Sequence, residues 1–168
     1  MTTRSVRLMG LGFALFCLFV CAPVYAITGT GSGVANERLV TSGCGSGTNS
    51  FYFTFVLRAG QKWRLVDDNG DAFAGSFSSD SSGRNLTLRF DSSSQKRLIG
   101  NVRESASYLC GLSVRVKSYS EPVIKIRMNA RFNAFTASLI MRATGSTSNG
   151  SGSAQFSVAV NRGIFRKR

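Results

Sequence analysis

The stretch QKWRLVDDNGDAFAGSF, residues 61–77, constrains the fold of this chain more than any other part. Apolar residues alternate with polar ones on both sides of the turn-forming cluster DDNGD, which is the pattern of a β-hairpin. A two-residue turn would set large apolar side chains opposite small ones. A three-residue loop, with its glycine in the left-handed conformation, instead pairs Leu65 with Phe73 and Trp63 with Gly75. We therefore predict a hairpin in this second register.

The same alternation recurs in short segments that are separated by turn-forming residues. We expect further strands at residues 51–58, 86–90, 112–117, 124–133, 136–144 and 154–160. Each of these segments has one apolar face and one polar face, as a half-buried antiparallel strand requires.

One stretch has a different period. Leu98, Val102, Ala106 and Leu109 are spaced for one side of a helix, and Ser92–Ser94 provides residues that cap a helix start. We predict a short helix near 93–107. The chain is thus expected to be all-β with one short helix, in an antiparallel β-barrel or β-sandwich of about eight strands.

The first 26 residues have the three parts of a secretory signal peptide. Arg4 and Arg7 precede an apolar run at 8–20, and small residues end the segment at Ala26. The apolar run is too short for a membrane anchor and is followed by Pro23. We predict cleavage after Ala26 and a secreted or periplasmic protein.

Composition divides the rest of the chain. Residues 27–50 are rich in Gly, Ser and Thr with little periodicity, which predicts a mobile leader. Residues 51–165 are expected to form a single antiparallel β domain, and residues 166–168 a basic tail.

Two of the four cysteines lie in the predicted signal peptide, which leaves Cys44 and Cys110. A pair of cysteines in an exported protein predicts a disulfide. A zinc site is the alternative, but the sequence contains no His, and two thiolates do not complete a tetrahedral shell. We expect no metal, and a disulfide that ties the end of the helix to the leader.

The sequence offers few groups for catalysis. No His is present as a base near neutral pH. Asp67, Asp68 and Asp71 crowd one turn, which is typical of solvated turn-forming residues. We expect a protein that is not an enzyme and has no cofactor.

The positive charge points to anionic partners. Arg4 and Arg7 account for two of the formal net charge of +13, so the chain beyond residue 26 carries +11. Such a balance favours anionic polysaccharide, lipopolysaccharide or anionic lipid. Nucleic acid is not expected as a partner, because secretion separates the protein from the nucleic acids inside the cell.

Five basic residues alternate with apolar ones on two expected strands. They are predicted to line up as a cationic ladder on one sheet face and to form an anion-binding site; they are Arg115, Lys117, Lys125, Arg127 and Arg131. The alternative is a solvated outer face that balances an apolar inner one.

The aromatic residues suggest a different ligand. Ten of the 13 Phe residues lie beyond the signal peptide, and a barrel lined by Phe is able to hold a small apolar ligand. The tetrapeptide Gly60-Gln61-Lys62-Trp63 resembles the Gly-x-Trp opening of lipocalin-like barrels, with one additional residue. This resemblance covers four residues and assigns no family.

The hypotheses on function are therefore three. The first is a secreted or periplasmic, non-enzymatic binding module for an anionic polymer or lipid, or for a small apolar ligand in a barrel interior. The second is a structural or assembly component of the bacterial cell envelope that acts through protein contacts. The third is a small outer-membrane barrel.

Overall fold

The computed structural model describes residues 27–168, so the predicted signal peptide and its cleavage site lie outside the described residues. In chain order the elements are β1 (Gly29–Thr41), β2 (Gly45–Arg58), the short 3-10 helix η1 (Ala59–Gln61), β3 (Lys62–Asp67), β4 (Ala72–Ser79), β5 (Asn85–Phe90), α1 (Ser92–Cys110), β6 (Arg115–Tyr119), β7 (Val123–Met128), β8 (Ala134–Thr147) and β9 (Gly150–Lys167).

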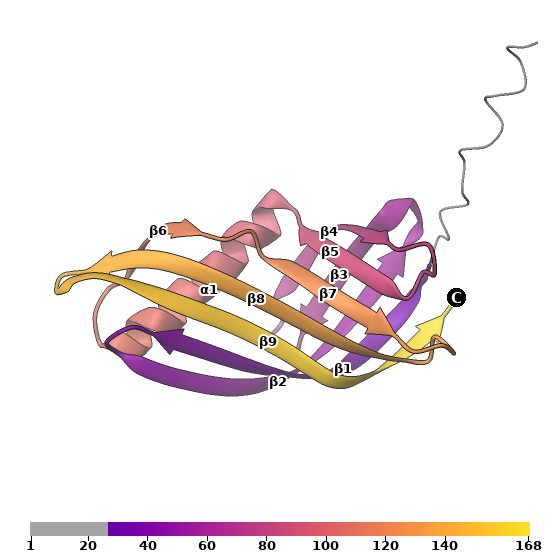
Figure 1. The fold of residues 1–168 in the computed structure, drawn as a ribbon, viewed down its shortest axis with the longest axis horizontal. Coiled ribbons are helices and arrows are strands. Elements are labelled where there is room, and N and C mark those ends of the chain that lie inside the picture. The colour runs from indigo at the N-terminus through magenta and orange to yellow at the C-terminus, as the bar shows by residue number, and fades with distance from the viewer. Residues whose placement is uncertain (1–26) are drawn as a thin grey trace, which may run out of the picture.

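Eight of the strands close into an antiparallel barrel, which decides between the barrel and the sandwich (Figure 1). The order around the barrel is β1-β2-β3-β4-β5-β7-β8-β9, and β9 pairs back onto β1. The ninth strand, β6, pairs with β8 beyond the end of β7, so β6 and β7 lie end to end along one edge of β8.

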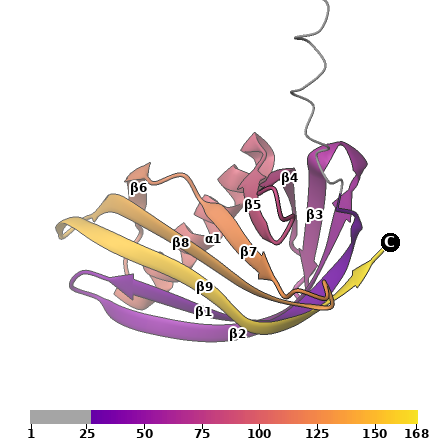
Figure 2. The ribbon, with the colours of Figure 1, turned by 45° about the vertical axis from the view of Figure 1, so that its right-hand side comes forward.

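The barrel is uneven in height because two of its hairpins are long. The β1–β2 and β8–β9 hairpins both extend past the body of the barrel, toward the left of Figures 1 and 2. Helix α1 contacts strands β1, β2, β4 and β5. Cys110 at its end is bonded to Cys44 in the β1–β2 turn, as predicted, with a Cα–Cα distance of 4.8 Å.

The predicted helix is confirmed and extends three residues further, to Cys110. Its N-cap is Asp91, where we expected one of the serines that follow; the Asp91 carboxylate accepts a 2.8 Å hydrogen bond from the Ser94 backbone N–H. That bond holds the pKa of Asp91 below its usual range. Gly111 ends the helix in the left-handed conformation, with φ of 61°.

The predicted hairpin register is confirmed. Leu65 lies opposite Phe73 and Trp63 opposite Gly75, and Gly70 has the left-handed φ of 86° that the loop needs. The Trp63 indole N–H lies over the glycine and donates to two backbone carbonyls, those of Ser76 and Arg89, each at 3.0 Å.

Aromatic side chains fill one part of the barrel interior. The rings of Phe55 and Phe135 meet edge to face with centroids 5.2 Å apart, and Phe165 stacks on Phe55 at 6.1 Å. All three side chains are buried. The inward face of β2 that the alternation of residues 51–57 predicts is therefore the wall of this core.

The predicted mobile leader at residues 27–50 is wrong, because these residues form β1 and the first part of β2. The glycines that suggested flexibility have a packing role. A Cβ at Gly31 would overlap the ring of Phe55, and a Cβ at Gly29 the ring of Phe165. Glycine at these inward positions leaves room for aromatic rings from other strands.

Two other boundaries also differ from the prediction. The basic tail at 166–168 is not free, because β9 continues to Lys167 and the Arg168 backbone N–H donates to the Thr28 carbonyl at 3.0 Å. The strand expected at 124–133 ends at Met128, and Phe132 lies in the following turn with φ of 52°.

Candidate ligand-binding cavity

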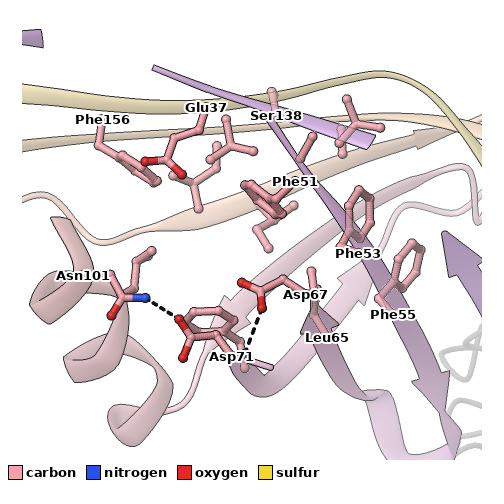
Figure 3. A pocket seen from close by; sticks show the side chains of 18 of the residues that line it. Glu37, Phe51, Phe53, Phe55, Leu65, Asp67, Asp71, Asn101, Ser138 and Phe156 are labelled. Atoms are coloured by element: carbon pink, nitrogen blue, oxygen red, sulfur yellow. Dashed lines mark hydrogen bonds between the residues drawn. The ribbon is translucent and has the colours of Figure 1, made fainter. Parts of the chain in front are cut away.

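A cavity of about 270 Å³ lies between the barrel wall and α1 (Figure 3). Its lining comes from all eight strands of the barrel and from the helix. The side chains are mostly apolar or aromatic, with Phe51, Phe53, Phe55, Phe73, Phe90, Phe135 and Phe156 among them.

Strand alternation explains how these rings reach one space. Phe51, Phe53 and Phe55 are two residues apart on β2, so all three point inward. Phe156 on β9 and Phe135 on β8 come from the two strands that follow β1 around the barrel, and the pairing of β9 with β1 brings their rings to the same space.

Helix α1 forms another side of the cavity. Leu98, Asn101, Val102 and Ser105 are spaced at three and four residues, so they lie on one helical face and line the cavity together. The helix meets the barrel through this face, and the disulfide at Cys110 holds its end.

Three carboxylates also line the cavity: Glu37 on β1, Asp67 at the end of β3, and Asp71 just before β4. In Figure 3 Glu37 and Asp67 point into the cavity from different sides, and Asp71 lies next to Asn101 of the helix. The Asp71 carboxylate accepts a 2.7 Å hydrogen bond from the Asn101 amide.

The environment of two of these carboxylates disfavours their charged form. Burial raises the pKa of Glu37, and the Asp67 carboxylate raises it further. Burial also raises the pKa of Asp67, against the effect of its hydrogen bonds from the backbone N–H groups of Asp71 and Asn69. Ionisation of either group in the folded protein therefore costs free energy.

The cavity lining contains no Lys or Arg, within the part of the chain that the structure describes. In residues 27–168 no three acidic or cysteine side chains come together in a group that could hold a metal ion. No helix among the described residues is long and apolar enough to cross a membrane.

The five predicted anion-binding residues lie in three places. Lys125 and Arg127 are exposed on the outer face of β7 and line a shallow hollow of about 480 Å³ with Thr87 and Thr136. Arg115 and Lys117 are on β6, further along β8. Arg131 is in the β7–β8 turn.

The five residues therefore do not lie side by side on two adjacent strands. Since β6 and β7 lie end to end, the basic residues of one strand are not beside those of the other. The neighbour of Lys125 across the sheet is Thr87 of β5 on one side and Ser138 of β8 on the other.

A second hollow, of about 590 Å³, lies between α1 and the turns of the two long hairpins. Its lining is rich in Gly and Ser and includes both cysteines of the disulfide. Few of its side chains carry charge or aromatic surface, so it offers little to recognise a ligand.

The sequence contains a signal for the carboxylates of the first cavity; the turn interpretation missed it for Asp67, and the prediction of a leader at residues 27–50 missed it for Glu37. Asp67 continues the inward positions Trp63 and Leu65, and Glu37 lies between the inward Ala35 and Leu39. Parity along the strand was enough to place these acids inside. The turn-forming composition predicts a solvated Asp67, whereas its position in β3 turns the side chain inward.

No protein-family model matches this chain, and no similar curated protein was found.

Proposed function

We propose that this protein is a non-enzymatic binding module that holds a small, largely apolar molecule inside its barrel. The cavity of about 270 Å³ lined by aromatic side chains supports this function most directly. Its volume is just below the range of about 300–1,000 Å³ for small-molecule sites, which suits a compact ligand.

The composition of the lining supports binding over catalysis. The sequence has no His, and the cavity offers carboxylates that are not arranged around a nucleophile. The Asp67 carboxylate accepts hydrogen bonds from the turn backbone, and the Asp71 carboxylate accepts one from Asn101. These contacts hold both carboxylates in fixed positions in the cavity lining.

The proposed location is the periplasm or the cell exterior. The signal-peptide pattern of the first 26 residues supports export, and the Cys44–Cys110 disulfide is compatible with an oxidising compartment. The polarity of the barrel argues for a water-soluble module over an outer-membrane barrel, because aromatic side chains point inward while Arg64 and Lys125 are exposed on strands.

Binding of a fluorescent apolar probe tests this function. N-phenyl-1-naphthylamine should give a saturable rise in fluorescence with the mature protein. Ser105→Phe adds a ring at the cavity lining, at a helix position that is not fully buried, and should weaken binding by about tenfold.

Ser92→Phe is the matched control, since Ser92 is exposed at the start of the same helix and does not line the cavity. It should bind the probe like the wild type. Absence of saturable binding to the wild type, or equal binding by both variants, would show that the cavity is not the site.

A second candidate function is anion binding on the outer face of β7. Lys125 and Arg127 are both exposed, and the hollow beside them is also lined by polar side chains such as Thr87 and Thr136. Binding to heparin should weaken steeply as salt rises above physiological strength, where the Debye length is about 8 Å.

The double variant Lys125→Ser/Arg127→Ser should lose most of this binding. The matched control is Arg115→Ser/Lys117→Ser on β6, which removes the same charge away from the hollow. If both double variants lose the same affinity, heparin recognises net charge only, and the site on β7 is excluded.

A further inference from the structure

We infer that the ligand of the cavity is a small organic cation, with an ammonium group between Glu37 and Asp67 and an apolar part against the aromatic rings. This inference rests on the proposed function and specifies the chemical class of the ligand. The cavity itself defines the site, and the carboxylates determine which molecule it accepts.

The two carboxylates belong to elements that the fold brings to one space. Glu37 points inward from β1 and Asp67 from the end of β3, two strands that flank β2 (Figure 3). The apolar side chains between them include Phe51 and Phe53 of β2. A molecule in this space would contact rings along its body and carboxylates at one end.

The distribution of charge makes this cavity exceptional within the molecule. The whole chain has eight acidic residues against 21 basic ones, yet three of the eight acids line this one cavity. The cavity lining has no Lys or Arg in the described chain to balance them. The inside of a basic protein is therefore locally negative.

Glu37 supplies the most direct indication that the cavity takes a cation. Its carboxylate is half-buried and makes neither a hydrogen bond nor an ion pair within the described residues. Burial raises its pKa, and Asp67 adds repulsion. A cation between the two groups would remove both costs, because each carboxylate would gain an opposite charge.

An organic cation fits this arrangement better than a metal ion. No group of three metal-ligating side chains is formed among residues 27–168, so the cavity does not offer the set of ligands that a metal ion needs. An ammonium group needs fewer ligands and less regular geometry, and it is attracted to aromatic faces as well as to carboxylates.

Three ligands with the same chain and different head groups test this inference. n-Octylammonium, 1-octanol and octanoate should be titrated into the mature protein by calorimetry. We expect octylammonium to bind at least about tenfold more tightly than octanoate. Non-specific attraction predicts the opposite order, because the protein carries a net charge of +11 beyond residue 26.

Variants identify the source of the preference. Glu37→Gln should reduce the ratio of octylammonium to octanol affinity several-fold, and Glu37→Gln/Asp67→Asn should abolish the preference for the cation. The ratio is the readout because a distorted cavity would weaken the binding of both ligands and leave their ratio unchanged. Glu104→Gln is the matched control, since Glu104 is exposed on α1 outside the cavity lining, and it should keep the wild-type ratio.

The outcomes separate this inference from the proposed function. If 1-octanol binds but octanoate binds as tightly as octylammonium, the cavity is a binding site and the cationic ligand is excluded. An unchanged ratio in the double variant excludes it as well. If none of the three ligands binds, the proposed function fails and the inference fails with it.

Discussion

At the scale of single residues, contact between Trp63 and Gly75 explains why the β3–β4 hairpin needs a glycine. The indole N–H reaches two backbone carbonyls only because no side chain stands at position 75. A Cβ there would overlap the backbone oxygen of Arg89 and lie 2.9 Å from the indole nitrogen. The neighbouring atoms are backbone and a buried ring, which have little freedom to move.

Gly75→Ala should therefore destabilise the protein by about 1–3 kcal/mol, the usual cost of overpacking a filled core. Urea unfolding measures the change. Gly100→Ala is the matched control: Gly100 is inside α1 and a Cβ there meets no atom within 4 Å. It should instead raise stability by about 1 kcal/mol, because alanine favours a helix. Equal effects of the two substitutions would contradict the packing argument.

The charge of Glu37 has a consequence for stability as a function of pH. Burial and the Asp67 carboxylate raise its pKa in the folded protein. The unfolded chain therefore ionises this group more readily, and ionisation lowers stability as pH rises above the unfolded value of about 4.3. Glu37→Gln removes the penalty, so its Tm at pH 7 should exceed that of the wild type.

The difference in Tm should shrink as pH falls below this value, since both proteins then carry a neutral side chain. Thermal unfolding between pH 3 and pH 7 measures it. Glu104→Gln, at an exposed position, should show no comparable gain. A gain from Glu37→Gln that is the same at pH 3 and pH 7 would mean that packing, not charge, causes it.

At the scale of elements, α1 is held to the barrel at both ends. The Asp91 cap fixes its start, and the Ser94 hydroxyl accepts a 2.8 Å hydrogen bond from the Ala74 backbone N–H of β4. The disulfide fixes its end to the β1–β2 turn. Between these points the helix contributes Leu98 and Val102 to the core and to the cavity.

Cys110→Ser should lower the free energy of unfolding by about 2–4 kcal/mol, because the disulfide joins residues 66 positions apart and restricts the unfolded chain. Denaturant unfolding of protein produced from residue 27 onward measures this, after non-reducing peptide mapping has shown the Cys44–Cys110 bond. Cys44→Ser/Cys110→Ser should cost about the same as the single variant. Free thiols at both positions of the wild type would contradict the prediction.

At the scale of the whole molecule, pairing of β1 with β9 closes the barrel and joins the two ends of the described chain. Gly29 lies opposite Lys167, and Phe165 packs inward over Gly29 and against Phe55. The last strand is thus part of the core, and the cavity depends on it because β9 supplies Phe156 and Val158 to the lining.

Phe165→Ala should destabilise the protein by about 3–5 kcal/mol, since it removes a buried ring from the closing strand. Ile164→Ala is the matched control, because Ile164 is the adjacent residue and is 61% exposed on the outer face. It should change stability by less than about 0.5 kcal/mol. Chemical denaturation of both variants measures the difference, and similar losses would show that the end of β9 is not built into the core.

The features predicted from sequence were those that neighbouring residues specify. The β3–β4 register follows from the pairing of faces across one turn, and the helix follows from the spacing of Leu98, Val102 and Ala106. The disulfide was predicted from the signal-peptide pattern and from the two cysteines that lie beyond it. The glycine-rich strand β1 was not predicted, because glycines at its inward positions give no apolar alternation. The space that these glycines leave is filled by the rings of Phe55 and Phe165, which belong to other strands.

The sequence by itself determined that this chain is an antiparallel β protein with one helix, because alternation and helical spacing are properties of adjacent residues. Only the tertiary structure decided the closure of the barrel, the end-to-end position of β6 and β7, and the placement of Glu37 and Asp67 in the lining of one cavity. These depend on pairings between strands that are far apart in the chain, and the local pattern is the same for several such pairings.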